Sequence, residues 1–262
     1  MNEPSIHSVE AFLSSVEIDP IDEFGLESMT AAAGPPQPDF TNETEQSILV
    51  GSQVAGFSSD VPIELRPVLT NVFLLAQLVA DKKTNSGGGT EDWHKHYFDT
   101  LSNVGWRKIA HSNVEQVVSG TALEVHREII PIITAAFGPA VTAASTIIRI
   151  LKGLDDMDKD MPWITLFNSK SRRATSNPFQ FSQTIMEGGV PKIVLLAFEL
   201  NAARSVTQIL FFKFSSDEAS LSHYMEQLSA SVEILHKTKS KVEELVIEHV
   251  SSNLAAIEDL EL

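Results

Sequence analysis

The densest hydrophobic stretch of the chain runs from Val190 to Phe214 and is interrupted only by a short polar segment, Asn201–Arg204. Val, Ile, Leu and Phe dominate both halves of the stretch. Short runs rich in β-branched and aromatic residues, bounded by glycine and polar residues, are typical of strands. The pattern therefore predicts two buried strands, Val190–Ala202 and Val206–Ser215.

Both sides of the second predicted strand carry large apolar side chains. A strand with this pattern is covered on both faces of its sheet. Further strands are predicted at Trp163–Asn168, Pro178–Met186 and Ser220–Ala230, with a hairpin turn at Glu187–Gly189. Because the connections are short, we expect a mostly antiparallel sheet with helices on both faces.

Helical periodicity and capping residues mark several other segments. Val68, Val72, Leu75 and Val79 share one helical face. Glycines and capping residues supply boundaries elsewhere, and Trp106–Val118 has the composition of a strand. The helices predicted in this way are Glu45–Phe57, Pro67–Lys82, Thr90–Val104 and Val232–Ile257.

The segment from Ile129 to Ile148 carries no charged residue over twenty positions. That length alone would allow a membrane span. Gly138-Pro139 lies in its middle, however, and proline interrupts the helical hydrogen bonds. We therefore expect a helical hairpin, 122–137 and 140–153, whose arms are each too short to cross a bilayer. Its apolar residues, expected to lie against the sheet, include Ile129, Ile133, Phe137, Val141 and Ile148.

Composition and charge narrow the possible functions. The 262 residues are 43% hydrophobic, lack cysteine and carry a net charge of −16. Such a charge argues against nucleic acid as a partner. Residues 1–45 hold ten acids, five prolines and no Lys or Arg. We therefore divide the chain into an acidic, mostly disordered segment, 1–45, and a folded domain, 46–262. Short apolar patches in the segment could dock on the domain. The N-terminus lacks the pattern of a signal peptide.

The chain carries no recognisable catalytic, cofactor or metal motif. There is no Gly-x-Ser-x-Gly, His-Glu-x-x-His or glycine-rich nucleotide sequence. His94 and His96 are two positions apart and would lie on different helical faces, as packed or solvated side chains. The acidic run Asp155–Asp160 lacks the glycine and glutamate of a calcium loop. We therefore expect no enzyme activity, no cofactor and no metal.

Two stretches resemble the Cyt family of cytolytic delta-endotoxins, whose fold is shared by volvatoxin and a bacterial virulence-factor family. They are QILFFKFSSDEASLSHYMEQL, Gln208–Leu228, and GGVPKIVLLAFELNAA, Gly188–Ala203. The hairpin at 122–153, with its uncharged centre, is similar to the second helix pair of that family. The resemblance covers roughly 45–250 and rests on the order and spacing of elements. The acidic N-terminal segment and the long C-terminal helix depart from the family pattern.

The resemblance implies a single-domain α+β fold, a mostly antiparallel sheet wrapped by two helical hairpins. It implies a protein made soluble, released by a route other than a classical signal peptide, which acts on a target cell membrane. Family members bind phospholipid directly, with zwitterionic lipid preferred, and permeabilise membranes by pore formation or detergent-like disruption. Self-association on membranes and a dimer in solution would accompany this. The expected lipid contacts are Leu195, Phe198, Leu210, Phe212 and Phe214.

Two alternatives remain open. A non-lytic lipid-binding or virulence-associated protein of the same fold could hold an acyl chain between helices and sheet. An ordinary buried sheet with covering helices would also give the observed hydrophobic pattern. Release of dye from liposomes separates lysis from binding.

Overall fold

A mixed eight-stranded sheet forms the centre of the molecule. The computed structural model describes residues 4–20, 35–85, 90–117, 123–138, 142–172, 176–214 and 218–257. Seven strands follow the order β10-β1-β2-β6-β7-β9-β3, and β4 also pairs with β9. Their bounds are β1 Gln46–Val50, β2 Gln53–Phe57, β3 Trp106–His111, β4 Glu115–Val117, β6 Asn177–Glu187, β7 Val190–Ala202, β9 Ala219–Ala230 and β10 Leu254–Ala256.

The longest strands, β6, β7 and β9, form an antiparallel meander that sets the register of the sheet. Phe179 of β6 faces Phe198 of β7, which in turn faces His223 of β9. Gly188 and Gly189 form the turn between β6 and β7, with φ values of 61° and 80° that suit glycine. The predicted turn at Glu187–Gly189 is confirmed.

One strand pair departs from the antiparallel expectation. Strand β2 runs parallel to β6, with Val54 opposite Phe181. The chain between these two strands includes α3, α4, β3, β4, α5, α6 and α7, and such a long crossover is what a parallel pair requires. The other pairs of the large sheet are antiparallel, so the sheet is mostly antiparallel, as predicted.

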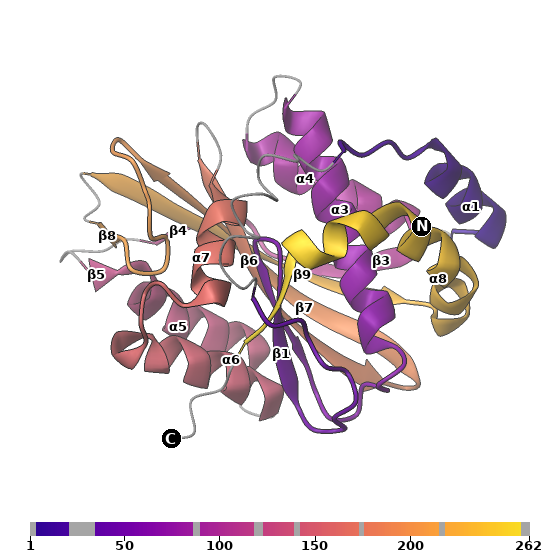
Figure 1. The fold of residues 1–262 in the computed structure, drawn as a ribbon, viewed down its shortest axis with the longest axis horizontal. Coiled ribbons are helices and arrows are strands. Elements are labelled where there is room, and N and C mark those ends of the chain that lie inside the picture. Colours follow the sequence, from indigo (N-terminus) through magenta and orange to yellow (C-terminus); the bar gives the residue numbers. More distant parts are fainter. Residues whose placement is uncertain are drawn as a thin grey trace.

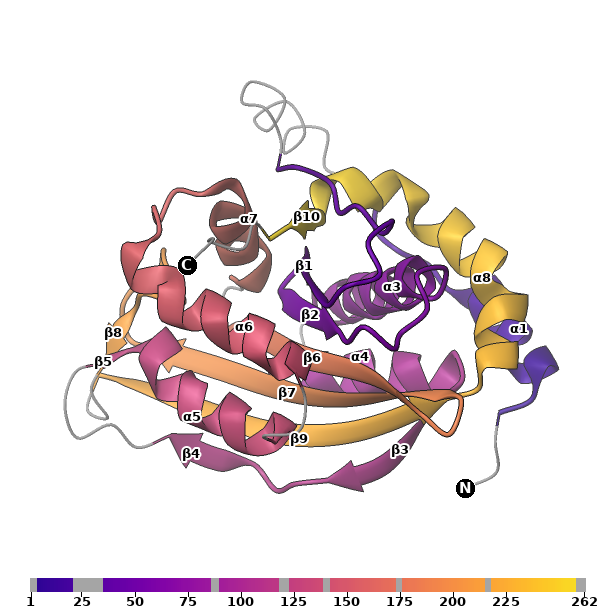
Figure 2. The same ribbon diagram turned by 90° about the horizontal axis from the view of Figure 1, so that it is seen from below.

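Helices cover both faces of the sheet (Figures 1 and 2). One face carries α3, α4 and α8, with α1 packed beside α8, and the other carries α5, α6 and α7. The pairs α3–α4 and α5–α6 are the two hairpins expected from the sequence. Their bounds are α1 Ile6–Ser15, α3 Arg66–Asn85, α4 Thr90–Asn103, α5 Val125–Phe137, α6 Thr142–Gly153, α7 Pro162–Ser171 and α8 Val232–Val246.

Strand β7 shows how the two cores are built. Ile193, Leu195 and Ala197 point into the layer beneath α3, α4 and α8. The intervening residues Leu196 and Phe198 point into the layer beneath α5, α6 and α7. This alternation follows from the two-residue period of a strand, so a sheet apolar on both faces needs two helical layers.

Residues 45–57 were predicted as a helix, and this is wrong. They form the antiparallel hairpin β1–β2. The turn contains Gly51 at φ 55°, a left-handed conformation that other residues rarely adopt. Gln77 of α3 fills the space beside Gly51, accepting from the Ser52 N–H and donating to the Val50 carbonyl. A short apolar run cannot separate helix from strand by periodicity alone.

Residues 163–168 were predicted as a strand but belong to helix α7. The helix begins at Pro162, which suits the first helical position because that residue needs no N–H partner. Trp163, Ile164 and Phe167 are buried in the core against the sheet. Aromatic composition favoured a strand, whereas the proline was the better signal.

The predicted strand Val206–Ser215 is also largely wrong. Among its described residues, 206–214, only β8, Lys213–Phe214, is a strand, and it pairs with β5, Leu123–Glu124, outside the main sheet. Ser215 lies outside the described residues. Residues 206–212 form a compact loop, closed by a bond from the Phe212 N–H to the Ile209 carbonyl. Asn168 of α7 accepts from the Ile209 N–H. Tertiary contacts have overridden the alternating pattern.

The two ends of the chain differ from expectation as well. Helix α8 ends at Val246, a 3-10 helix follows over Ile247–Ser252, and β10 then pairs with β1, so no single helix reaches Ile257. In the acidic segment predicted as mostly disordered, residues 6–15 form α1, with Val9 and Leu13 buried. The apolar patch around Leu13 docks on the body. The division of the chain at residue 45 stays a prediction.

Candidate functional site

The five predicted lipid-contact residues are all buried, but they lie in two different layers. Leu195 belongs to the core beneath α3, α4 and α8. Phe198, Leu210, Phe212 and Phe214 belong to the core beneath α5, α6 and α7. The structure therefore brings four of the five together, on the side covered by the α5–α6 hairpin.

That hairpin lies on an aromatic layer of the sheet. Phe179 stacks on Phe198 with ring centroids 5.2 Å apart, and Phe181 meets Phe198 edge-on at 6.1 Å. Ile129, Ile133 and Phe137 of α5 are buried in the same cluster, and Ile148 of α6 is partly buried against it. Val141 lies outside the described residues.

The outer side of α5 carries no charge beyond its first turn. Pro131, Thr134 and Ala135 are exposed, whereas Ile130 and Ile132 are half-buried. None of the helices in the described part of the chain combines the length and the hydropathy that crossing a bilayer requires.

A few polar contacts hold the N-terminal end of α5 in place. The N–H groups of Val125 and His126 donate to the carbonyls of Phe212 and Leu210 at 3.0 and 2.9 Å. The buried His126 ring also contacts the Leu210 carbonyl, with Nδ1 2.9 Å away. The hairpin is thus tied at its base to the 206–214 segment. Thr146 of α6 also donates to Glu45 at 3.4 Å, and the other buried side chains described in the hairpin beyond its base are apolar.

His126 also lies between two carboxylates that spacing in the sequence did not bring together. Ligand atoms of Glu124, His126 and Asp155 lie within 4.8 Å of one another. Arg127 already donates to Asp155 at 2.9 Å, and Lys213 lies 3.6 Å from Glu124. These cations offset the carboxylate charges that a metal would need, so we describe the cluster as an ion-pair network.

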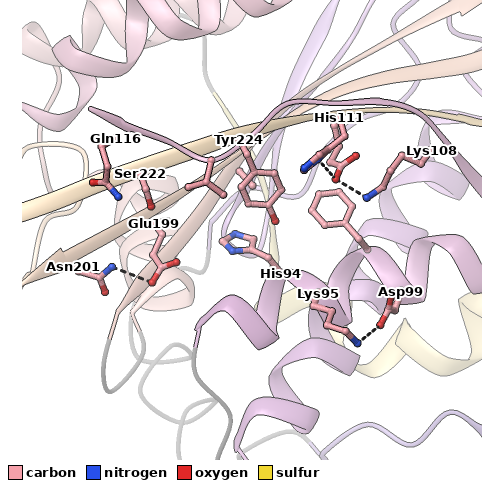
Figure 3. A pocket seen from close by; sticks show the side chains of 14 residues that line it. His94, Lys95, Asp99, Lys108, His111, Gln116, Glu199, Asn201, Ser222 and Tyr224 are labelled. Atoms are coloured by element: carbon pink, nitrogen blue, oxygen red, sulfur yellow. Dashed lines mark hydrogen bonds and ion pairs between the residues drawn. The ribbon is translucent and has the colours of Figure 1, made fainter. Parts of the chain in front are cut away.

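A polar pocket of about 490 Å³ opens on the other side of the sheet, beneath α4 (Figure 3). Strands β9 and β7 form its floor, β3 and the segment leading into β4 form one wall, and α4 forms its roof. Ser222, Tyr224 and Glu226 alternate along β9, so all three point to this face. The other lining residues are His94, Lys95, Phe98, Asp99, Lys108, His111, Val114, Gln116, Ala197, Glu199 and Asn201.

Glu226 is the most deeply buried acid of the pocket, with 2% of its side chain exposed. Lys108 Nζ and His111 Nδ1 both lie 2.7 Å from the same oxygen, Oε1. The second oxygen, Oε2, has no hydrogen-bond partner. A buried carboxylate oxygen without a donor is costly, so this one marks an incomplete arrangement.

Two neutral polar side chains, His94 and Tyr224, line the same pocket. Burial lowers the pKa of His94 to about 3, and His94 Nε2 has no hydrogen-bond partner. The Tyr224 ring meets the His94 ring edge-on at 5.5 Å. Burial raises the pKa of Tyr224, and the negative charges of Glu226 and Glu199 raise it further. Tyr224 is therefore a neutral phenol between two acids.

The sequence analysis did not find this pocket. Of the two environments expected for His94, packed or solvated, the structure shows a packed side chain. The available signal was the run of polar residues at every second position of β9, which shows a polar patch on one face of this strand. The contributions of α4 and β3 depend on tertiary structure and leave no local pattern.

Comparison with known proteins gives structural likeness without a sequence match. No known family's sequence profile and no curated protein matches the chain. A solved delta-endotoxin covers 82% of this chain and 89% of its own, at 14% identity and a TM-score of 0.39. Activated Cyt2Ba from Bacillus thuringiensis subsp. israelensis covers 75% of this chain and 90% of its own, at 15% identity and a TM-score of 0.31. The Evf virulence factor covers 91% of this chain and 93% of its own, at 11% identity and a TM-score of 0.30.

These structural neighbours are of the toxin and virulence-factor kinds that the sequence resembles. The likeness is one of fold.

Proposed function

We propose that this protein permeabilises membranes and that it does so by moving the α5–α6 hairpin away from the sheet. One observation carries the proposal: a hairpin whose residues 129–148 are uncharged covers an aromatic layer mainly through apolar contacts, with polar contacts at its base and one between Thr146 and Glu45. The sequence resemblance to cytolytic delta-endotoxins supports the same function. No catalytic step is involved.

Detachment of the hairpin removes apolar contacts, and its free energy depends on whether water or lipid then covers the exposed side chains. Separating the hairpin from the sheet in water would expose large apolar side chains, each at a cost of about 1.5–3 kcal/mol. A bilayer interface can cover both the apolar side of an amphipathic helix and the aromatic side of the sheet. Detachment is then unfavourable in solution and favourable at a membrane.

The location of the predicted lipid contacts fits this movement. Phe198, Leu210, Phe212 and Phe214 lie in the layer that the hairpin covers, so all four are candidate lipid contacts. Leu195 lies beneath α3 and would meet lipid only if that helical layer also moved. The proposal therefore assigns Leu195 to the part of the core that stays folded.

The charge of the chain bears on the lipid it would bind. A net charge of −16 is repelled by anionic surfaces, where each charge near the membrane contributes about 1 kcal/mol. We therefore propose a preference for zwitterionic phospholipid. From the resemblance to cytolytic delta-endotoxins we also propose self-association on the membrane, and action on a target cell after release by a route other than a classical signal peptide. A dimer in solution is a further expectation.

The experiment is dye release from phosphatidylcholine liposomes, measured with flotation of the same vesicles. Lysis predicts that the protein floats with the vesicles and releases dye, more readily than with phosphatidylserine vesicles at low salt. Flotation without release would favour a lipid carrier instead. The absence of both would contradict a membrane function.

A further inference from the structure

The pocket beneath α4 has two halves of different chemistry, which lie on opposite sides of the Tyr224 ring (Figure 3). In one half, Lys95 pairs with Asp99 at 2.9 Å, and Lys108 pairs with Glu226 at 2.7 Å. The charges of that half therefore compensate one another within the protein. The other half, here called the amide subsite, is lined by four polar side chains that carry a single charge: Gln116, Glu199, Asn201 and Ser222.

Three residues of the amide subsite form a row across three neighbouring strands. Gln116 of β4 is opposite Ser222 of β9, and Ser222 is opposite Glu199 of β7. Side chains that are directly opposite point to the same face of a sheet and have Cβ atoms about 4.5–5.5 Å apart. Asn201 follows Glu199 by two residues, so it points to this face as well. A small ligand can therefore contact several of these side chains at once.

The amide subsite keeps donors and acceptors at the pocket surface that the protein does not use. Gln116 is exposed and Ser222 is half-buried, and neither side chain has a hydrogen-bond partner in the described part of the chain. Asn201 donates to Glu199 Oε1 at 3.0 Å, which leaves Glu199 Oε2 without a donor from the described residues. Amides and hydroxyls both donate and accept, whereas a carboxylate only accepts. A matching ligand supplies donors and acceptors together.

We propose that the amide subsite binds a neutral sugar ring through its hydroxyl groups. Each sugar hydroxyl is a donor and an acceptor, which matches the mixture of groups in the row. Tyr224 and Val114, which is 63% exposed, line the same pocket and offer apolar contacts to the C–H groups of the ring. An anion would be repelled by Glu199. A divalent cation is a poorer fit, because Glu199 is the one carboxylate of the subsite.

The space is large enough for a monosaccharide or the end of a longer glycan. The whole pocket has a volume of about 490 Å³, which is within the range of small-molecule sites. The same ring could belong to a free sugar or to the headgroup of a glycolipid, and the experiment includes both.

The first test is NMR titration of the full-length protein with the methyl glycosides of glucose, galactose and mannose. Tetrahydropyran-2-methanol is the matched analogue, because it keeps the ring and one hydroxyl but lacks the other hydroxyls. We expect at least one glycoside to bind at least tenfold more tightly than this analogue. A smaller difference, or no binding of any of the glycosides, would overturn the proposal.

The second test removes groups from the row. Gln116→Ala shortens an exposed side chain, and Glu199→Gln keeps the size of a half-buried side chain but removes its charge. The matched control is Glu243→Gln, an exposed acid of α8 outside the pocket. We expect both row variants to weaken glycoside binding at least fivefold with little change in Tm, and the control to stay within twofold of wild type.

Unchanged affinity in either row variant would contradict the assignment. If Glu199→Gln fails to fold, the exposed substitution Gln116→Ala decides the matter.

Vesicle flotation then separates the two sources of the sugar. Stronger binding to phosphatidylcholine vesicles that contain glucosylceramide or lactosylceramide than to phosphatidylcholine alone, lost in Gln116→Ala, identifies a glycolipid headgroup. Binding of soluble glycosides without this preference identifies a free sugar. The NMR titration needs neither vesicles nor lysis, so this inference and the proposed function can each fail while the other stands.

Discussion

Buried polar side chains of two kinds lie in the layer beneath α3 and α4. Beneath α3 and α4, Tyr97 donates to Gln53 at 2.8 Å, and Gln53 donates to Ser182 at 2.7 Å. That network satisfies its members and holds α4 on the sheet. Nearby, His94 and Glu226 each keep one unpartnered atom. The first group stabilises the fold, whereas the unpartnered atoms of the second lower its stability.

The neutral state of His94 makes stability depend on pH. Its folded pKa, lowered to about 3 by burial, lies below the unfolded value near 6.5, so the unfolded chain binds the proton more tightly. This contribution is present above pH 6.5 and is lost as pH falls towards 3. We expect wild type to lose about 3 kcal/mol more unfolding free energy than His94→Phe between pH 7 and 4.

Urea unfolding at the two pH values measures this difference. The exposed His236→Gln is the control and should follow the wild type. Identical pH profiles for wild type and His94→Phe would show that His94 is not buried as a neutral ring.

The aromatic layer makes a separate prediction about stability. Phe198 is fully buried and stacks on Phe179 and, at 5.7 Å, on His223. Phe198→Ala should cost about 3–5 kcal/mol in urea unfolding, because it leaves a cavity at the centre of the layer. Ile109→Ala removes a side chain that is 51% exposed and should cost less than about 0.5 kcal/mol. A similar small cost at both positions would contradict the packing described for Phe198.

At the scale of elements, the sequence predicts best where a long pattern is continuous. Helix α3, the α5–α6 hairpin and the strands β6, β7 and β9 follow from periodicity, charge-free length and glycine turns. The errors fall on short apolar segments, where neighbours decide the structure. Gln77 stabilises the turn of β1–β2, and Asn168 of α7 holds the loop that replaces the predicted strand at Val206. The pocket forms only where α4 packs over β9, and no local sequence pattern predicts that contact.

The hairpin itself makes a prediction that separates lipid contact from stability. Ala135 is an exposed residue on the uncharged side of α5. Ala135→Asp should change unfolding free energy by no more than about 1 kcal/mol. It should slow dye release at least tenfold, because a charge on the otherwise uncharged outer side of α5 opposes entry of this helix into lipid.

Ser240→Asp, an exposed substitution on α8, is the matched control and should release dye at the wild-type rate. Equal rates for both variants would indicate that the exposed side of α5 does not enter lipid.

At the scale of the whole molecule, the acidic N-terminal segment contacts the body at basic side chains. Lys241 of α8 donates to the Glu10 carbonyl at 3.2 Å, and Lys82 of α3 lies 3.5 Å from Glu17. The charge imbalance of this segment was evident in the sequence. Its helix α1 was not predicted, because the apolar residues that dock it, Val9 and Leu13, are few and far apart.

Removal of this segment should increase activity. Deleting residues 1–34 removes seven acids and no Lys or Arg, and retains the bond from the Ala256 N–H to the Pro36 carbonyl. Lower negative charge and exposed Lys82 and Lys241 should speed dye release from liposomes at equal protein concentration. An unchanged or slower rate would identify the segment as a structural arm, one that could serve dimerisation.

The central claim, that the α5–α6 hairpin must leave the sheet, has a direct test because the chain contains no cysteine. Thr146 of α6 lies beside Glu45, at the start of β1, with Oγ1 and Oε2 3.4 Å apart. Glu45→Cys with Thr146→Cys can therefore be joined by a short reducible cross-linker, with each single variant as control. Dye release should stop in the cross-linked protein, return after reduction and persist in both controls. Full release by the cross-linked, unreduced protein would contradict the account.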